Sequence, residues 1–213
     1  MSAFGSRVAL SALALMAAAA PRLHAQRDDS FTWSLGVEAG VLGFQTQAQT
    51  TTKYIPSVGA NFLIMAGRGG LLVGFDEGIG TDENASAVIL FNDIRKYQAI
   101  LMAFPVKGAV QPYFGGGAGI MQIVGPRVDK DLVTDPTAQA SLVADAKERG
   151  SSGFLTLVGG VQGRAGRVTI FAQYQVTTSP SDDRLMHGAT QSLMGGIRLN
   201  LGSARDGVSA GGY

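Results

Sequence analysis

The sequence predicts an all-β fold, an eight-stranded antiparallel up-and-down transmembrane β-barrel with a short helix in its third long loop. Residues 153–178 read as two strands joined by a glycine-containing turn at 164–167. In the second of these strands apolar and polar residues alternate, which gives one apolar face over about the 9–11 tilted residues of a membrane-crossing strand. Low charge (15%) and 30 glycines are typical of a strand-rich chain with many turns.

Residues 1–25 have the pattern of a secretory signal peptide. Arg7 supplies the positive start, Val8 to Ala20 are apolar, Pro21 breaks the helix, and Ala25 is the small residue at the expected cut. The apolar run is shorter than the ~20 residues of a membrane-spanning helix, which disfavours an anchor. Cleavage after Ala25 and export are therefore expected, and the absence of cysteine fits an oxidising compartment.

The other strands follow the same two-residue period. They are expected at 33–44, 53–66, 71–77, 86–103, 111–124 and 189–201, with the hairpin of 153–178 supplying the remaining two. Long polar loops at 45–52, 78–85, 125–150 and 179–188 alternate with short turns near Gly67, Pro105 and Arg164, as in a barrel with two different rims. The predicted organisation is a signal peptide at 1–25, a barrel at 26–202 and a polar tail at 203–213.

The third long loop contains a helix signal. Asp135 is placed as a cap, Pro136 occupies the first helical position, and Gly150 is a stop signal. A short helix is expected over 138–149.

The polar face of the strands is expected to point into the barrel. Its residues include Asn61, Gln173 and Gln175 and four charges, Glu38, Asp76, Lys96 and Arg198. Because a buried charge without a partner is costly, we expect these four to form an internal ion-pair network. The alternative is separate solvation of the charges at opposite rims. A soluble lipocalin-like barrel would have the opposite direction, with the apolar set inside.

Six aromatic residues are expected at the two membrane interfaces. Trp33, Phe104 and Tyr113 fall near one rim, and Tyr54, Phe75 and Phe154 fall near the other. The alternative reason for their presence is the general enrichment of aromatic residues in sheets.

The segment Pro112-Tyr113-Phe114-Gly115-Gly116-Gly117-Ala118-Gly119 resembles a Pro-Tyr-x-Gly-x-Gly-x-Gly strand of the small outer-membrane β-barrel family, which includes the OmpA-type transmembrane domain. Residues 193–201 fit the last strand of the same family. The resemblance implies a location in the bacterial outer membrane, outer-membrane lipid as surroundings, and the barrel-assembly machinery as a partner during insertion. The family's last strand commonly ends in an aromatic residue, whereas Leu201 stands in that place here.

No catalytic, cofactor or metal site is predicted. His187 lies near Ser179, Ser181, Asp182 and Asp183, but it is not followed by the serine that outer-membrane deacylases of this family would have. Asp129, Asp131 and Asp135 could bind calcium, but their spacing matches no EF-hand and Lys130 lies among them, so a solvated loop is the better interpretation. The glycines at 115–119 lack the Lys-Ser/Thr of a phosphate loop and fall in a strand.

The predicted function is a structural, adhesive or surface-recognition role carried by the external loops, chiefly 125–150, without enzymatic activity and without a cofactor. The near-neutral charge gives no case for nucleic acid. The alternatives are a narrow channel for small solutes, a lipid-modifying outer-membrane enzyme and a soluble lipocalin-like carrier. An external ligand is possible, and the sequence does not identify it.

Overall fold

The computed structural model describes residues 30–180 and 183–205, and the expected signal peptide and residues 206–213 lie outside that part of the chain. Its elements, in chain order, are β1 Ser30–Thr46, β2 Gln49–Ala66, β3 Gly69–Asn84, β4 Ile89–Ala103, β5 Val110–Val124, β6 Arg127–Val128, α2 Pro136–Arg149, β7 Ser151–Ala165, β8 Val168–Thr177 and β9 Met186–Arg205.

The strands form the predicted eight-stranded up-and-down barrel. Each long strand pairs antiparallel with the next along the chain, and β1 pairs with both β2 and β9, which closes the sheet. The two-residue strand β6 adds only a short pairing to β4 beyond the barrel wall. Closure leaves no open edge whose backbone groups would lack partners in lipid.

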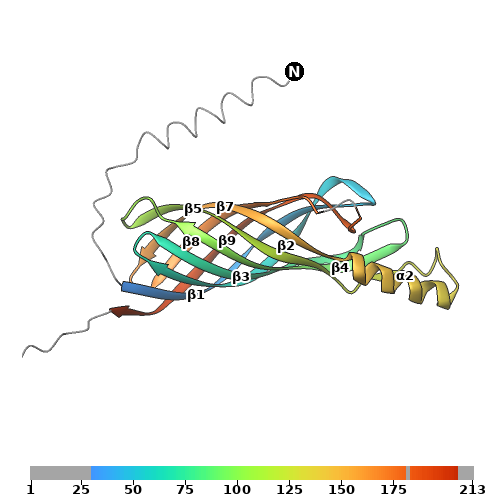
Figure 1. Cartoon of the computed structure of the whole chain (residues 1–213), viewed down its shortest axis with the longest axis horizontal. Helices are drawn as coiled ribbons and strands as arrows, with labels where there is room; N and C mark the ends of the chain where they lie inside the picture. The colour runs from blue at the N-terminus through green and yellow to red at the C-terminus, as the bar shows by residue number, and fades with distance from the viewer. Residues whose placement is uncertain (1–29, 181–182, 206–213) are drawn as a thin grey trace, which may run out of the picture.

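The two ends of the barrel differ (Figure 1). At one end lie α2, the β1–β2 turn and the β3–β4 connection, and we call this the α2 end. At the other lie Ser30 and Arg205 and the turns at Gly67 and Gly166, and we call this the terminus end. The glycines of these two turns have φ of +59° and +62°, a conformation that residues with a Cβ rarely adopt.

Two of the predicted long loops are wrong, because β1, β2 and β3 continue through them. Residues 47–48 form a two-residue turn, and β3 runs to Asn84. Thr51 and Thr52 are polar, which suggested a loop, but β-branched threonine fits a strand that has left the membrane. The pairing of β3 with β4 shifts register between Ile79 and Glu83, where Asp82 has φ of 52°. The tail prediction is also corrected, since β9 runs to Arg205.

The helix is present where the sequence predicts it. Asp135 caps α2, its side chain accepting a hydrogen bond from Thr137 N at 3.0 Å, and Pro136 follows at the first position. Lys147 and Arg149 occupy the last turn, where cations are favourable. No helix in the described part of the chain is long and apolar enough to cross a bilayer.

The barrel wall is apolar on the outside. Leu101 and Leu157 are 70% and 71% exposed, and most exposed large apolar residues share the outward positions of the long strands with them. The inward positions of the same strands hold the buried charges and amides. The direction is therefore that of a membrane barrel and the reverse of a lipocalin.

Candidate functional site

The barrel interior is divided into three layers along its axis. A polar layer in the middle contains the buried residues Glu38, Asn61, Asp76, Lys96, Gln98, Gln162, Gln173, Gln175, Ser192 and Arg198. An apolar cluster lies on each side of it, one at the α2 end and one at the terminus end. The sequence predicts the polar layer, but it does not predict that apolar clusters cover it at both ends.

Asp76 and Lys96 form the ion pair of the polar layer. They face each other across the β3–β4 pairing, with Lys96 Nζ 3.5 Å from Asp76 Oδ2 and both side chains almost fully buried. Gln98 Nε2 donates to the same carboxylate oxygen at 2.8 Å, and Lys96 Nζ reaches Ser192 Oγ on the far wall at 3.4 Å. Gln98 lies on β4 beside Lys96, so Ser192 of β9 is the contact that joins the pair to a further strand.

Glu38 and Arg198 are connected through an amide. Asn61 Nδ2 donates to Glu38 Oε1 at 3.0 Å, and its Oδ1 accepts from Arg198 Nε at 2.7 Å. Gln173 Nε2 donates to the other Glu38 oxygen at 2.7 Å. The structure therefore places all four predicted charges in one interior layer, but the connection between them combines one ion pair with amide bridges.

The guanidinium of Arg198 has a second kind of partner. Its Nη1 donates to Gln162 Oε1 at 3.2 Å, and its Cζ lies 3.6 Å from the centroid of the Phe171 ring. Gly36 makes room for this side chain, since a Cβ there would be 2.6 Å from Arg198 Cγ. Small residues beside large ones are what a narrow eight-stranded interior requires.

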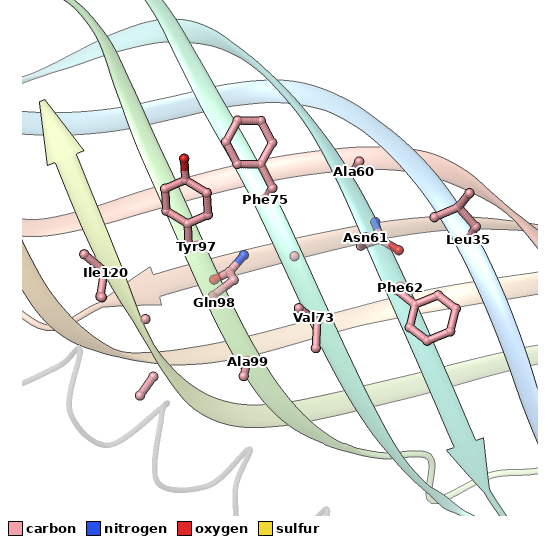
Figure 2. A pocket seen from close by; sticks show the side chains of 13 residues that line it. Leu35, Ala60, Asn61, Phe62, Val73, Phe75, Tyr97, Gln98, Ala99 and Ile120 are labelled. Carbon is pink, nitrogen blue, oxygen red and sulfur yellow. The ribbon is translucent and has the colours of Figure 1, made fainter. Parts of the chain in front are cut away.

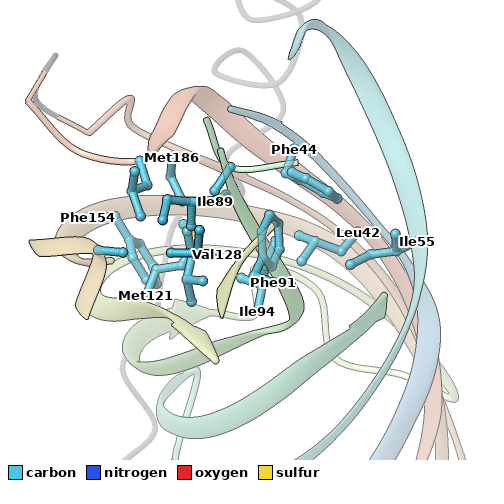
Figure 3. Close-up of a cluster of buried hydrophobic side chains, with 14 residues drawn as sticks. Leu42, Phe44, Ile55, Ile89, Phe91, Ile94, Met121, Val128, Phe154 and Met186 are labelled. Carbon is cyan, nitrogen blue, oxygen red and sulfur yellow. The ribbon is translucent and has the colours of Figure 1, made fainter. Parts of the chain in front are cut away.

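The apolar cluster at the α2 end closes that end of the lumen (Figure 3). The labelled side chains of Leu42, Phe44, Phe91, Ile94, Met121 and Phe154 come from several strands around the barrel and converge inside it. Ala146 of α2 is buried in the same cluster, and Leu142 and Val143 pack against it. The helix therefore acts as a lid on the apolar cluster.

The second apolar cluster closes the terminus end. It contains Leu63, Met65, Leu72, Ile100, Met102, Phe104, Tyr113 and Val158. The sequence carries a signal for both clusters that its two-residue period hides, because apolar residues run consecutively at 88–91 and 99–102. Where both faces of a membrane strand are apolar, the inner face must pack against other apolar groups.

The six aromatic residues predicted at the membrane interfaces divide into an outward and an inward set. Trp33 and Tyr54 are exposed on the outer wall, and Phe75 points outward beside Tyr97 with ring centroids 5.2 Å apart. Phe104, Tyr113 and Phe154 are wrong: they are only 2–4% exposed and fill the two apolar clusters. An inward aromatic at the end of a strand has the same sequence pattern as an outward one, and only the pairing register separates them.

Tyr174 is a further outward aromatic residue, and the sequence analysis does not include it among the interface residues. Tyr174 Oη donates to Gln191 Oε1 at 2.6 Å, and Gln191 Nε2 donates to Tyr54 Oη at 3.0 Å. These residues lie on β8, β9 and β2, and β1 lies between β9 and β2 in the sheet. The chain of hydrogen bonds runs along the outer wall toward the α2 end, as expected for an interface belt.

Arg149 at the end of α2 ties three connections of the α2 end together. Its Nε donates to Asp183 O at 2.7 Å, its Nη2 to Gln47 Oε1 at 3.3 Å, and its Nη1 pairs with Asp145 at 3.3 Å. Leu185 N donates to Arg149 O at 3.3 Å as well. We call α2 with the β1–β2 turn and Asp183–Leu185 the α2 cap.

The other residues singled out in the sequence take structural positions. His187 is exposed on β9 opposite Gln45, while Ser181 and Asp182 lie outside the described residues. Asp129 accepts from Asp131 N at 3.0 Å, and no group of possible metal ligands occurs in the described residues. The glycines at 115–119 lie in β5, where a Cβ at Gly115 would be 3.0 Å from Ile100 Cγ2.

The sequence matches no protein-family model and no curated protein sequence. The structure is similar to the crystal structure of Neisserial surface protein A, with a TM-score of 0.56 and 13% identity over 79% of this chain and 97% of that one. Ail of Yersinia pestis, crystallised with the heparin analogue sucrose octasulfate, gives 0.48 and 16% over 81% and 98%, and the outer-membrane enzyme PagL gives 0.43 and 11% over 78% and 98%. The similarity to Neisserial surface protein A establishes the fold alone, which is that of the small eight-stranded outer-membrane barrels.

Proposed function

We propose that this protein resides in the bacterial outer membrane with the α2 end outside, conducts no solutes, and acts in surface recognition or adhesion through the α2 cap. The observation that carries the proposal is the contrast between a lumen closed at both ends and an ordered, exposed cap at one end.

Membrane insertion is supported by the outer wall. Exposing its apolar side chains to water would cost free energy, whereas contact with lipid would not. Closed barrels are also one of the two structures that can span a membrane. Toward the α2 end, Glu77 and Arg95 are the first charged residues on the outer wall of β3 and β4, where they pair at 2.7 Å, and Ile79 is exposed one row beyond them. Beyond this row the strands continue into the region where charged side chains are solvated.

The orientation is supported by the chain ends and the turns. Outer-membrane barrels have short turns on the periplasmic side and longer connections outside. Here the two-residue turns at Gly67 and Gly166 share an end with Ser30 and Arg205, while the longest connection, residues 125–150, lies at the other end together with the short β1–β2 turn. A signal peptide at 1–25 would deliver the chain from the side on which both ends remain.

A channel is disfavoured by the interior. The polar layer is covered by large apolar side chains at both ends, including Phe44 and Phe91 at one and Phe104 at the other. A solute would have to displace a packed core that includes part of α2. We retain the prediction that the protein is not an enzyme, and no described residue hydrogen-bonds to the exposed His187 side chain to activate it.

Recognition is supported by the organisation of the α2 cap. Arg149 holds three connections in one arrangement, so a partner would not have to pay to order them. Leu132, in the connection that precedes α2, is 62% exposed although it lies away from the apolar outer wall of the barrel. Ala140 and Ala144 are exposed on α2 beyond its packed face.

The test compares adherence of cells that display matched variants. Cells producing the full chain would be applied to immobilised fibronectin, laminin and collagen, with vector-only cells as the baseline. The double variant Ala140→Gln with Ala144→Gln places larger side chains on the exposed face of a helix that tolerates glutamine. Val106→Gln makes a similar exposed change at the terminus end.

We expect adherence above baseline for the full chain and for Val106→Gln, and a fall to baseline for the α2 double variant. Equal adherence of all three, or adherence at the vector-only level for the full chain, would contradict recognition by the α2 cap. A slower unboiled band on a gel would reveal a variant that failed to fold.

A further inference from the structure

An apolar groove of about 550 Å³ runs along the outer wall between β1 and β5 (Figure 2). Small side chains form its floor, namely Val73, Ala99 and Ala118, and larger ones form its sides, namely Leu35, Phe62, Phe75, Tyr97 and Ile120. These residues occupy outward positions, so the groove opens to the surroundings of the barrel and not to its lumen.

The strand register shows how the groove is oriented. One row of paired outward residues contains Phe62, Val73, Ala99 and Ala118, and the next row toward the α2 end contains Ala60, Phe75, Tyr97 and Ile120. The row after that contains Glu77, Arg95 and Gln122. The apolar groove therefore leads directly to the first charged row of the outer wall.

A second, polar pocket of about 260 Å³ begins at that row. Arg95, Gln122 and Val124 line it from the barrel wall, and Lys147 lines it from α2. Two cations from different elements thus line one pocket, which begins at the charged row where the apolar groove ends.

The charges of the polar pocket are arranged to receive an anion. Arg95 Nε donates to Glu77 Oε1 at 2.7 Å, and no described residue accepts a hydrogen bond from its two Nη groups. No described residue pairs with Lys147 either, and it is exposed at the end of α2. Glu77 and Asp93 are the acidic groups nearby on β3 and β4; Glu77 holds one side of the guanidinium and leaves the other toward the pocket.

We propose that the outer wall of β2–β5 is a binding site for a phosphorylated lipid, with an acyl chain in the apolar groove and the headgroup phosphate between Arg95 and Lys147. Charge complementarity selects this occupant, because guanidinium and ammonium groups favour phosphate and the floor of the groove is apolar. This proposal rests on the proposed insertion in a membrane. It goes further by naming a specific ligand, which insertion alone does not require.

The experiment measures retained lipid by native mass spectrometry of the protein folded in a non-ionic detergent. The probes are dioleoyl phosphatidic acid, dioleoylglycerol with the same chains and no phosphate, and inorganic phosphate. Arg95→Gln with Lys147→Gln removes the cations, and Arg68→Gln with Arg167→Gln removes two at the terminus end. Ala99→Leu with Ala118→Leu fills the groove, and Ala172→Leu makes the same change at an outward position of β8.

We expect phosphatidic acid to be retained at least about tenfold more strongly than dioleoylglycerol, and inorganic phosphate not to be retained, because both parts of the site are needed. The Arg95/Lys147 variant should lose this preference, the filled groove should lose retention, and both controls should behave as wild type. Equal retention of the two lipids, or equal losses in the controls, would overturn the site. Unboiled and boiled gel mobility of each sample separates these outcomes from failure of the membrane barrel itself.

Discussion

At the scale of single residues, the buried charges set the strictest condition on the sequence. Lys96 and Arg198 are each 1% exposed inside a barrel whose outer wall is apolar, so their charges must be compensated locally. Asp76 compensates Lys96 directly, and Asn61 connects Arg198 to Glu38. The connection between Arg198 and Glu38 therefore depends on Asn61, an uncharged residue that an argument from charges alone would not identify.

Replacing one member of the ion pair should cost more than replacing both. Asp76→Asn leaves the Lys96 ammonium buried without its counterion and is expected to destabilise the barrel by about 3–5 kcal/mol. Asp76→Asn combined with Lys96→Met should recover a large part of that loss, because no charge remains uncompensated. Urea unfolding followed by fluorescence of Trp33, the one tryptophan of the chain, measures both.

A double variant that is less stable than Asp76→Asn alone would contradict this view of the pair. Ser192→Ala is a suitable control, since it removes only the 3.4 Å contact from Lys96 Nζ and leaves the counterion in place. Its expected cost is about 1 kcal/mol.

At the scale of elements, the sequence predicts the strands and the helix better than it predicts their ends. Alternation identifies the faces of β8 and β9 correctly, and Asp135 with Pro136 identifies the start of α2. It does not show where a strand ends in water, because Thr51 and Thr52 suit a loop and a solvated strand equally well. Inward Phe104, Tyr113 and Phe154 were misplaced for a related reason: both faces of their strands are apolar near the barrel ends.

Arg149 is expected to control the order of the α2 cap. Arg149→Ala removes side-chain hydrogen bonds to Asp183 and Gln47, each worth roughly 1 kcal/mol, while the apolar contacts of Ala146 and Val143 keep the helix on the barrel. Amide hydrogen exchange in residues 136–149 should therefore accelerate about tenfold or more, with the barrel strands unchanged.

Lys147→Ala is the matched control on the same turn of the helix, because no described residue pairs with Lys147. Its exchange rates should stay near those of the wild type. Equal acceleration in both variants would mean that helix propensity, and not the contacts of Arg149, orders the cap.

At the scale of the whole molecule, the interior and the outer wall lead to separate conclusions. The outer wall is apolar between the terminus end and the Glu77–Arg95 row, and such a surface fits a lipid environment around the barrel. The interior is closed by two apolar clusters, which is why the proposed function lies at the surface and not in the lumen. The sequence predicts the first through the two-residue period, but the second depends on which apolar residues converge in space.

The central claim is that the barrel spans a membrane with the α2 end outside, and the absence of cysteine from the chain allows a direct test. Ala144→Cys on α2 and Val106→Cys at the terminus end would each be treated on intact cells with a membrane-impermeant maleimide. We predict labelling of Ala144→Cys on intact cells and labelling of Val106→Cys only after the outer membrane is permeabilised. Three results would contradict the account. They are the reverse pattern, labelling of both variants on intact cells, and labelling of neither variant until the outer membrane is permeabilised.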